Sequence, residues 1–414
     1  MEAIIERACG IDVHKKNIVV CLLIGKPGEK PKKTVRTFST MTEDLLACKD
    51  WLESEGCTHG ALESTGVYWK PIFNILEESI EVILANARDI KNVPGRKTDV
   101  RDCEWIADLL RHGLIKGSFI PPKPIRELRD LTRYRRKLIQ NRSSELNRIQ
   151  KFLEDANIKL SSVVTDINGV SATDMIHHLI KNDMNPQEIA DLAKGRLRNK
   201  ITELEKALNG YFSEHHRLIL RVSIQMVASY DKAIEALNRE IDQRMEPYEE
   251  ISERLQTIPG VKKTTVESII AEIGVDMSRF PSDAHLSSWA GVSPGNNESA
   301  GKRYSGRITP GNRWLKASLN EASWAASRTK GTYLKARFQR LAARRGKKRA
   351  SVALSHTILI MAYHIVKEQC TYYELGADFF DRLHEEQLIK RLTTRIKALG
   401  YMVNVQKLDT AACN

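Results

Sequence analysis

Apolar residues in the first part of the chain come in short runs, separated by turn-forming and helix-forming segments. Runs of about four to eight apolar or β-branched residues bounded by Gly, Pro or Asn are typical of strands, whereas apolar residues at every third or fourth position are typical of helices. The pattern predicts strands at residues 8–13, 18–24, 34–38, 59–62 and 81–85, and helices at 42–54, 68–78 and about 99–112.

The order of these predicted elements is three strands, a helix, a strand, a helix, a strand and a helix. A meander of three strands followed by α/β units gives a mixed sheet with helices on its faces. This is the layout of the RNase H-like fold, and it predicts an α/β domain over residues 1–120. The Pro-Pro-Lys-Pro run at 121–124 would form a stiff linker at the end of this domain.

Residues 121–255 have a helical pattern that is rich in charge. Two series of apolar residues recur at alternating intervals of three and four, which is the spacing of a coiled-coil seam. Such a seam indicates self-association, as a dimer or a tetramer, although amphipathic helices that pack within one chain give the same spacing. The two series are Leu146, Ile149, Leu153 and Ala156, and Val227, Tyr230, Ile234, Leu237 and Ile241.

Residues 256–370 are expected to form a third, mainly α-helical domain. Its first part has the pattern of a helix-hairpin-helix, with Pro259 and Gly260 in the tight turn and Lys262 and Lys263 beside the second helix. Backbone amides at such a helix start can hold a DNA phosphate, although a plain connection between two helices has the same pattern. Residues 371–414 are predicted to form a helical tail, to which no function is assigned.

The apolar run at residues 352–366 is shorter than a membrane span and contains two histidines, so it predicts a buried helix and no membrane partner. The N-terminus lacks the cationic start and apolar core of a signal peptide. The seven cysteines form no CxxC pair and no Cys/His ligand spacing, which indicates reduced thiols and no zinc site. A cytoplasmic protein is expected, associated with the nucleoid when it is bound to DNA.

Basic side chains outnumber acidic ones by 13, and this excess is concentrated. Residues 1–120 contain 17 basic and 18 acidic side chains, whereas residues 295–350 contain 15 basic and 2 acidic ones. A concentrated cationic surface favours a polyanion, because each neutralised phosphate releases condensed counterions. A nucleic acid is therefore the expected partner, and a solvated surface or attraction to anionic lipid is the alternative.

Four carboxylates are predicted to meet in the N-terminal domain. Asp12 lies on the first strand, Glu63 ends the fourth, and Asp99 and Asp102 lie three residues apart on the last helix and so share a face. Converging carboxylates repel one another unless cations lie between them, and hard cations with oxygen ligands suit this set. The constellation predicts a Mg²⁺ site for phosphoryl chemistry. Each acid alone has a structural alternative, as a cap or as one member of an ion pair.

Ser299 lies in a segment that is dense in Gly and Asn. Nearby cations would lower the cost of forming a serine alkoxide and would balance a pentacovalent phosphorane. Taken alone, a serine in a polar loop is usually structural, so both interpretations stay open. The basic residues that follow it are Lys302, Arg303, Arg307 and Arg313, and a further basic run contains Arg344, Arg345, Lys347 and Lys348.

Five segments together resemble the DEDD transposases of the IS110 family, the bridge-RNA-guided recombinases. The segments are GIDVHK, LESTGVYW, KTDVRDCEWIADLL, IPGVKKTTVESIIAEIG and SSWAGVSPGNNESAGKRYSGRITPGNRWLK. The resemblance implies a RuvC-like domain, a coiled coil, and a C-terminal transposase domain with a serine nucleophile. It places the four carboxylates Asp12, Glu63, Asp99 and Asp102 on the DEDD positions and Ser299 on the serine.

These observations predict an enzyme, a Mg²⁺-dependent DNA transposase that cuts and rejoins donor and target DNA. Guidance by a structured bridge RNA and the covalent serine intermediate are implied by the resemblance alone. The main alternative is a junction-resolving, metal-dependent endonuclease in which Ser299 is structural. A second alternative is a non-enzymatic RNA-binding protein with a decayed active site, which the presence of all four acids disfavours.

Overall fold

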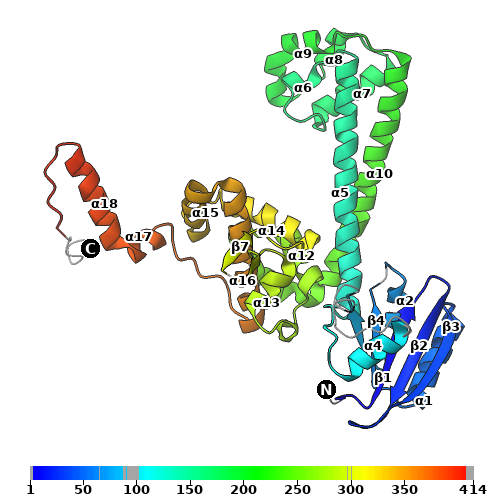
Figure 1. Cartoon of the computed structure of the whole chain (residues 1–414). Helices are drawn as coiled ribbons and strands as arrows, with labels where there is room; N and C mark the ends of the chain where they lie inside the picture. Colours follow the sequence, from blue (N-terminus) through cyan, green and yellow to red (C-terminus); the bar gives the residue numbers. More distant parts are fainter. Residues whose placement is uncertain are drawn as a thin grey trace. The chain divides into compact units, whose positions relative to one another are not determined.

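A computed structural model describes residues 3–64, 66–86, 90, 102–295, 297–299 and 301–406, without the side chains of 297–299 and 303–305. Contacts within the chain divide it into two units, residues 1–120 and 121–414. The first unit is built from a sheet and helices, and the second is mainly helical (Figure 1).

The described residues of the first unit form a mixed sheet of five strands, in the order β3-β2-β1-β4-β5. β1 is antiparallel to β2 and β2 to β3, whereas β4 is parallel to both β1 and β5. The five predicted strands and the mixed α/β sheet are confirmed. The strands are β1 (Arg7–Val13), β2 (Asn17–Ile24), β3 (Lys32–Ser39), β4 (His59–Glu63) and β5 (Glu81–Ala85).

Helices cover both faces of this sheet. They are α1 (Thr42–Ser54), α2 (Trp69–Leu76) and α4 (Asp102–Arg111). The face that carries Ile11 and Leu62 packs against α1 and α2. The opposite face is lined by the small residues Ala8, Gly10 and Ala61 and packs against α4. These small residues allow α4 to lie close to the sheet, because a Cβ atom at Gly10 would lie 2.2 Å from the carbonyl oxygen of Cys103 in α4.

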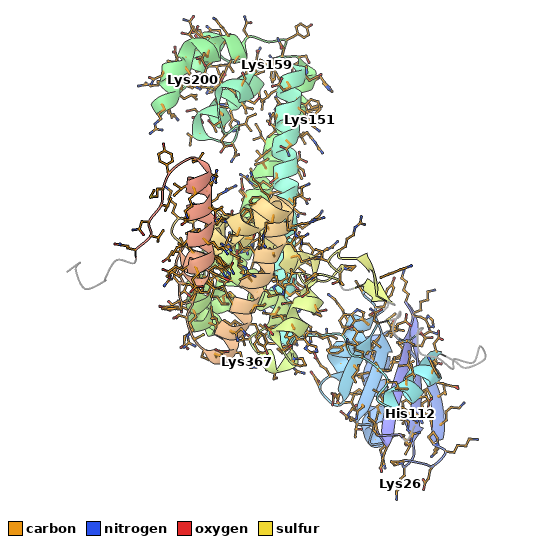
Figure 2. All side chains as sticks on the ribbon, turned by 60° about the vertical axis from the view of Figure 1, so that its left-hand side comes forward. Lys26, His112, Lys151, Lys159, Lys200 and Lys367 are labelled. Carbon is orange, nitrogen blue, oxygen red and sulfur yellow. The ribbon has the colours of Figure 1, made fainter. Side chains whose placement is uncertain are left out.

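In the second unit, α5 (Lys123–Asp155) and α10 (Glu214–Met245) run side by side in opposite directions (Figure 1). Arg135 Nη1 donates to the Asn238 side-chain oxygen at 3.0 Å, and further along the pair Arg142 Nε donates to the Asp231 carboxylate at 2.5 Å. A cap of short helices closes the end of this pair, and Figure 2 shows Lys159 and Lys200 on it. The cap contains α6 (Leu160–Val163), α7 (Val170–Lys181), α8 (Pro186–Ala190), the 3₁₀ helix Gly195–Lys200 and α9 (Ile201–Leu208).

The two predicted seams pack within one chain. Ile149, Leu153 and Ala156 are buried in the core of the cap together with Val227, and Ile241 is buried as well. The alternative of packing in cis therefore accounts for the spacing of these residues. Self-association of the chain stays a prediction.

The rest of the second unit is a helical bundle followed by a tail. The elements are the 3₁₀ helix Glu246–Tyr248, α11 (Glu249–Gln256), α12 (Lys263–Ile273), the 3₁₀ helix Met277–Arg279, α13 (Asp283–Ala290), β6 (Asn297–Ser299), β7 (Lys302–Ser305), α14 (Arg313–Ala326), α15 (Tyr333–Arg345), α16 (Lys347–Glu368), α17 (Phe379–Leu383) and α18 (Glu385–Ala398). Among the described helices, α16 alone is long and apolar enough to cross a membrane, but 56% of its apolar window is buried inside the bundle. Its core side chains, such as Leu354 and Ile358, are fully covered, which confirms the predicted buried helix.

Candidate functional site

Asp12 and Glu63 lie at the same end of two neighbouring strands. Asp12 is the penultimate residue of β1, and Glu63 is the last residue of β4. The register of this parallel pair places the residue before Asp12 opposite the residue before Glu63. Because side chains alternate between the faces of a strand, Asp12 shares the face of Gly10 and Glu63 shares the face of Ala61. Both partly buried carboxylates therefore lie on the α4 side of the sheet.

The direction of α4 brings Asp102 to this end of the sheet. Its last residue, Arg111, is buried, and Nη2 donates to the carbonyl oxygen of Gly25 at 2.8 Å, at the end where β1 begins. α4 thus runs antiparallel to β1, and Asp102, its first residue, lies toward the end that holds the two strand carboxylates.

His14 contacts Asp12, and the sequence analysis did not predict His14 as a site residue. Its Nε2 lies 3.1 Å from Oδ2 of Asp12, and the imidazole is largely exposed. In the tautomer with a proton on Nε2, His14 donates to the carboxylate and restricts its rotation. The available signal was its place in GIDVHK, directly after the strand that carries Asp12.

The predicted metal site is only partly within the described residues. Asp99 lies outside them, and among the side chains that are described no group of three or more His, Cys, Asp or Glu residues has the geometry to hold a metal ion. The three described carboxylates supply only oxygen donors, and this donor chemistry fits a hard divalent cation. Binding of Mg²⁺ at these residues stays a prediction.

Ser299 lies on a β-hairpin, whereas the sequence pattern predicted an irregular loop. β6 and β7 are antiparallel, and their register sets Ser299 opposite Lys302. Further from the turn, the amide of Gly295 donates to the carbonyl oxygen of Arg307 at 3.0 Å, and Pro294 and Ile308 form a β-bridge. The described residues of the range 294–308, here called the serine hairpin, therefore pair as two strands with an irregularity between Asn297 and Glu298, and Ser299 is the last residue of β6. The sequence signal was Gly301, which has a positive φ of 75° in the turn.

Exposed cations lie on and beside the serine hairpin. Lys302 and Arg307 are exposed, and Arg313 is an exposed residue at the start of α14. The guanidinium of Arg313 lies 5.0 Å from the centroid of the Trp314 ring, which restricts its position. The side chain of Arg303 is outside the described atoms. The local charge is suited to a phosphodiester, because the exposed cations can pair with its oxygens.

The predicted helix-hairpin-helix corresponds to the turn between α11 and α12, and one side of this turn is covered. Gly260 has a φ of 86°, and a Cβ atom there would lie 2.4 Å from the backbone nitrogen of Ala326 in α14. Lys263 Nζ lies 2.7 Å from the Asp242 carboxylate, and this hydrogen bond raises the pKa of Lys263. Lys262 is exposed. A phosphate at this turn would therefore meet one lysine that is already paired with an acid.

The strongest concentration of charge lies where α15 ends and α16 begins. Five cations, the basic corner, surround Gly346, and all are exposed: Arg344, Arg345, Lys347, Lys348 and Arg349. Arg349 is an addition to the residues predicted from sequence. Cations are favourable at the C-terminus of α15, but three of the five lie in the first turn of α16, where the helix dipole opposes them. A bound polyanion would relieve this repulsion.

Two family models match the chain. The transposase model for DEDD transposases of the IS110 type matches residues 9–158, and the model of the transposase IS116/IS110/IS902 family matches residues 252–339. Together the two segments make up more than half of the chain. The chain belongs to the IS110 family of transposases. No curated protein sequence matches it.

Membership of the IS110 family defines the general activity. This transposase is an enzyme that acts on DNA, as a transposase or recombinase, and DNA is therefore its partner. The resemblance predicted from the five sequence segments is confirmed. The DEDD domain also suggests dependence on a divalent metal. The first match contains Asp12, Glu63, Asp99 and Asp102, and the second contains Ser299.

Proposed function

We propose that this IS110-family transposase exchanges DNA strands through a covalent ester at Ser299, with Mg²⁺ held by Asp12, Glu63, Asp99 and Asp102. A structured bridge RNA selects the donor and target DNA; this part of the proposal is supported by the family resemblance. The enzyme acts as a homo-oligomer. The strand order β3-β2-β1-β4-β5 supports an RNase H-like, RuvC-like fold for residues 1–120.

The domain organisation of the proposal follows the sequence pattern. Residues 121–255 form the helical region, residues 256–370 the transposase domain with the serine hairpin, and residues 371–414 the tail. The division of the chain after residue 120 supports the first of these boundaries.

The observation that carries the proposal is the position of Ser299 on a paired hairpin. A nucleophile at the end of a hydrogen-bonded ladder has a backbone position that is fixed before DNA binds, so less entropy is lost on reaching the reacting geometry. Its cross-strand neighbour is Lys302, and Arg307 and Arg313 are exposed nearby in sequence. Cations around an attacking oxygen favour the alkoxide and stabilise the charge of a phosphorane.

The chemistry is an exchange of one phosphate ester for another. Ser299 Oγ loses its proton and attacks phosphorus, the bond from phosphorus to a deoxyribose oxygen breaks, and that oxygen takes up a proton. A deoxyribose hydroxyl of the second DNA strand then attacks the phosphoserine ester, and the Ser299 hydroxyl is released. The number of ester bonds is unchanged, so no outside energy source is needed. Bound Mg²⁺ would stabilise negative charge on the attacking and leaving oxygens.

The carboxylates and the cations have separate tasks in this proposal. Asp12, Glu63 and Asp102 place oxygen donors at one end of the sheet, and the contact with His14 limits the rotation of Asp12. The basic corner binds phosphates of the nucleic acid backbone, together with Lys262, Lys263 and the cations of the serine hairpin. Such contacts set affinity and register and carry little sequence information.

The test is the formation of a protein–DNA adduct that survives denaturation. Wild-type protein with guide RNA, donor DNA and Mg²⁺ should give the adduct on a denaturing gel, Ser299→Ala should give none, and Ser299→Cys should give it slowly. Asp12→Asn should form no adduct while it still binds nucleic acid. Cutting of DNA by Ser299→Ala at the wild-type rate would reject the serine mechanism and would favour the junction-resolving endonuclease.

A further inference from the structure

The base of the serine hairpin is closed by two glycines. Gly291 follows α13 with a φ of 71°, and Gly311 precedes α14 with a φ of 47°. A Cβ atom at Gly311 would lie 2.4 Å from both the Cα and the nitrogen of Gly291, so the two backbones are in direct contact. The hairpin therefore leaves the bundle through a narrow base, and whatever fixes this base also fixes the direction of the ladder.

Asn312 connects that base to the interior of the bundle. Its side-chain oxygen caps α14, because it accepts from the amides of Trp314 at 3.0 Å and Leu315 at 3.1 Å. Its side-chain nitrogen donates to Oε2 of Glu272 at 2.6 Å. Both ends of the amide group are thus used, one for the helix and one for a carboxylate on α12.

Glu272 is an unusual partner, since its carboxylate is 1% exposed. Arg133 of α5 donates to it through Nε and Nη2, each at 2.7 Å. Arg129, one turn earlier on α5, lies 3.5 Å from Oε2 and also donates to the main-chain oxygens of Ala271 and Glu272, at 3.0 and 2.7 Å. Burial lowers the pKa of Arg129 to about 10, which is still well above neutral pH, so Arg129 carries a positive charge there. Glu272 therefore joins α5, α12 and the base of the hairpin.

Stability alone does not explain such a buried ionic group. Removal of charges from water costs free energy that their attraction often fails to recover, and apolar replacements of buried ion pairs are frequently neutral or stabilising. The carboxylate fixes the orientation of its neighbours. The bidentate contact with a guanidinium sets the plane of the carboxylate, and one carboxylate oxygen then points toward Asn312. The group is suited to holding one geometry at the base of the hairpin.

We propose that Glu272 is a positioning residue for Ser299: held by Arg133 and Arg129, it fixes Asn312 and through it the serine hairpin. The inference deepens the proposed function and rests on it, since it takes Ser299 as the nucleophile. Loss of the link would loosen the base between Gly291 and Gly311, so the neighbouring pair of Gly295 and Arg307 would open more often and the direction of the hairpin would vary. A displacement of about 1 Å of a reacting group is enough to reduce a rate roughly 100-fold.

The experiment reverses the polarity of one hydrogen bond. Asn312→Asp keeps an oxygen that can cap α14 but sets a carboxylate against Glu272, so the link should break. In the double variant Glu272→Gln with Asn312→Asp, the glutamine amide can donate to the new carboxylate, and one negative charge remains beside Arg133 and Arg129. Adduct formation should be about 100-fold slower in Asn312→Asp, and the double variant should recover most of that loss. If the two substitutions only destabilised the fold, their effects on the rate of adduct formation would instead add in the double variant.

A second measurement monitors the backbone of the hairpin and does not depend on adduct formation. Hydrogen exchange at the backbone amides of the serine hairpin after Pro294 should become faster in Asn312→Asp and return toward the wild-type rate in the double variant, while the amides of α16 stay protected. Adduct formation by Ser299→Ala would reject the proposed function. The exchange rates would then still show, independently of that result, whether Glu272 and Asn312 fix the hairpin. The positioning role of Glu272 would be overturned if Asn312→Asp had wild-type rates of exchange and adduct formation. It would also be overturned if the double variant formed the adduct no faster than Asn312→Asp.

Discussion

The basic corner gives a prediction whose size follows from the number of its cations. The perturbation replaces four of them with glutamate: Arg344, Arg345, Lys347 and Lys348. Each phosphate contact adds roughly 0.9 to the slope of log K against log salt on duplex DNA, so loss of four contacts should lower that slope by up to about 3.6. Between about 50 and 200 mM salt, the wild type should then lose roughly 100-fold more affinity than the variant.

The variant should remain folded, because two of its glutamates interact favourably with a helix dipole and the other two interact unfavourably. Glutamate at positions 347 and 348 lies at the N-terminus of α16, where negative charge is favourable, and glutamate at 344 and 345 lies at the C-terminus of α15, where it is unfavourable. Each effect is about 0.3–1 kcal/mol and the two pairs have opposite signs. The melting temperature should therefore change little, and a loss of binding cannot be attributed to unfolding.

Fluorescence anisotropy with a labelled DNA duplex at several salt concentrations provides the measurement. The matched control reverses four exposed lysines elsewhere, Lys26, Lys30, Lys32 and Lys181, and so produces the same change in net charge. The control should retain most of the wild-type slope. If the two variants have equal slopes, net charge alone governs binding and the basic corner has no specific contact with phosphate.

Three further predictions concern packing, pH and thiol reactivity. Gly10→Ala should destabilise the first unit by about 3 kcal/mol, because its Cβ atom would lie 2.4 Å from the Ala107 backbone; an unchanged denaturation midpoint would show that α4 moves away freely. Burial, aided by Arg337 and opposed by Asp283, lowers the pKa of His356. Because the folded form then binds this proton less readily than the unfolded chain, stability should fall as the pH drops below about 6.5. His356→Gln should show a smaller decrease in melting temperature over that range, and equal decreases would contradict the assignment. Among the described cysteines, alkylation of the native protein should label exposed Cys370 and spare Cys48, since burial raises the pKa of Cys48 to about 12; peptide mapping that finds Cys48 modified at a similar rate would contradict this.

The sequence predicted the first unit well because its elements carry strong local signals. β1, β2 and β5 contain bounded apolar runs, and β3 is rich in β-branched residues. A meander followed by parallel strands then leaves few possible strand orders. The same reasoning placed Asp12 and Glu63 on neighbouring strands, as the register of β1 and β4 shows. Whether these acids bind a metal could not follow from it, because binding depends on distances between side chains from separate elements.

The second unit was less predictable because its decisive contacts are remote in sequence. The spacing of Leu153 and Ile241 is the same in a seam between two chains and in a pair of helices within one chain, and only the folded cap distinguishes them. The serine hairpin is short and contains several glycines, so its strands lack the apolar alternation that predicts pairing. Glu272 reads as an ordinary polar residue of a helix, and its burial depends on Arg133, which is 139 positions away.

Locating the covalent bond in the adduct tests the proposed serine chemistry directly. Wild-type protein that has reacted with donor DNA, guide RNA and Mg²⁺ would be denatured, digested with nuclease and protease, and analysed by tandem mass spectrometry. The expected product is a nucleotide phosphate esterified to Ser299 and to no other residue of the chain. An adduct on a different side chain, or complete strand exchange with no protein-linked nucleotide at any time, would contradict it.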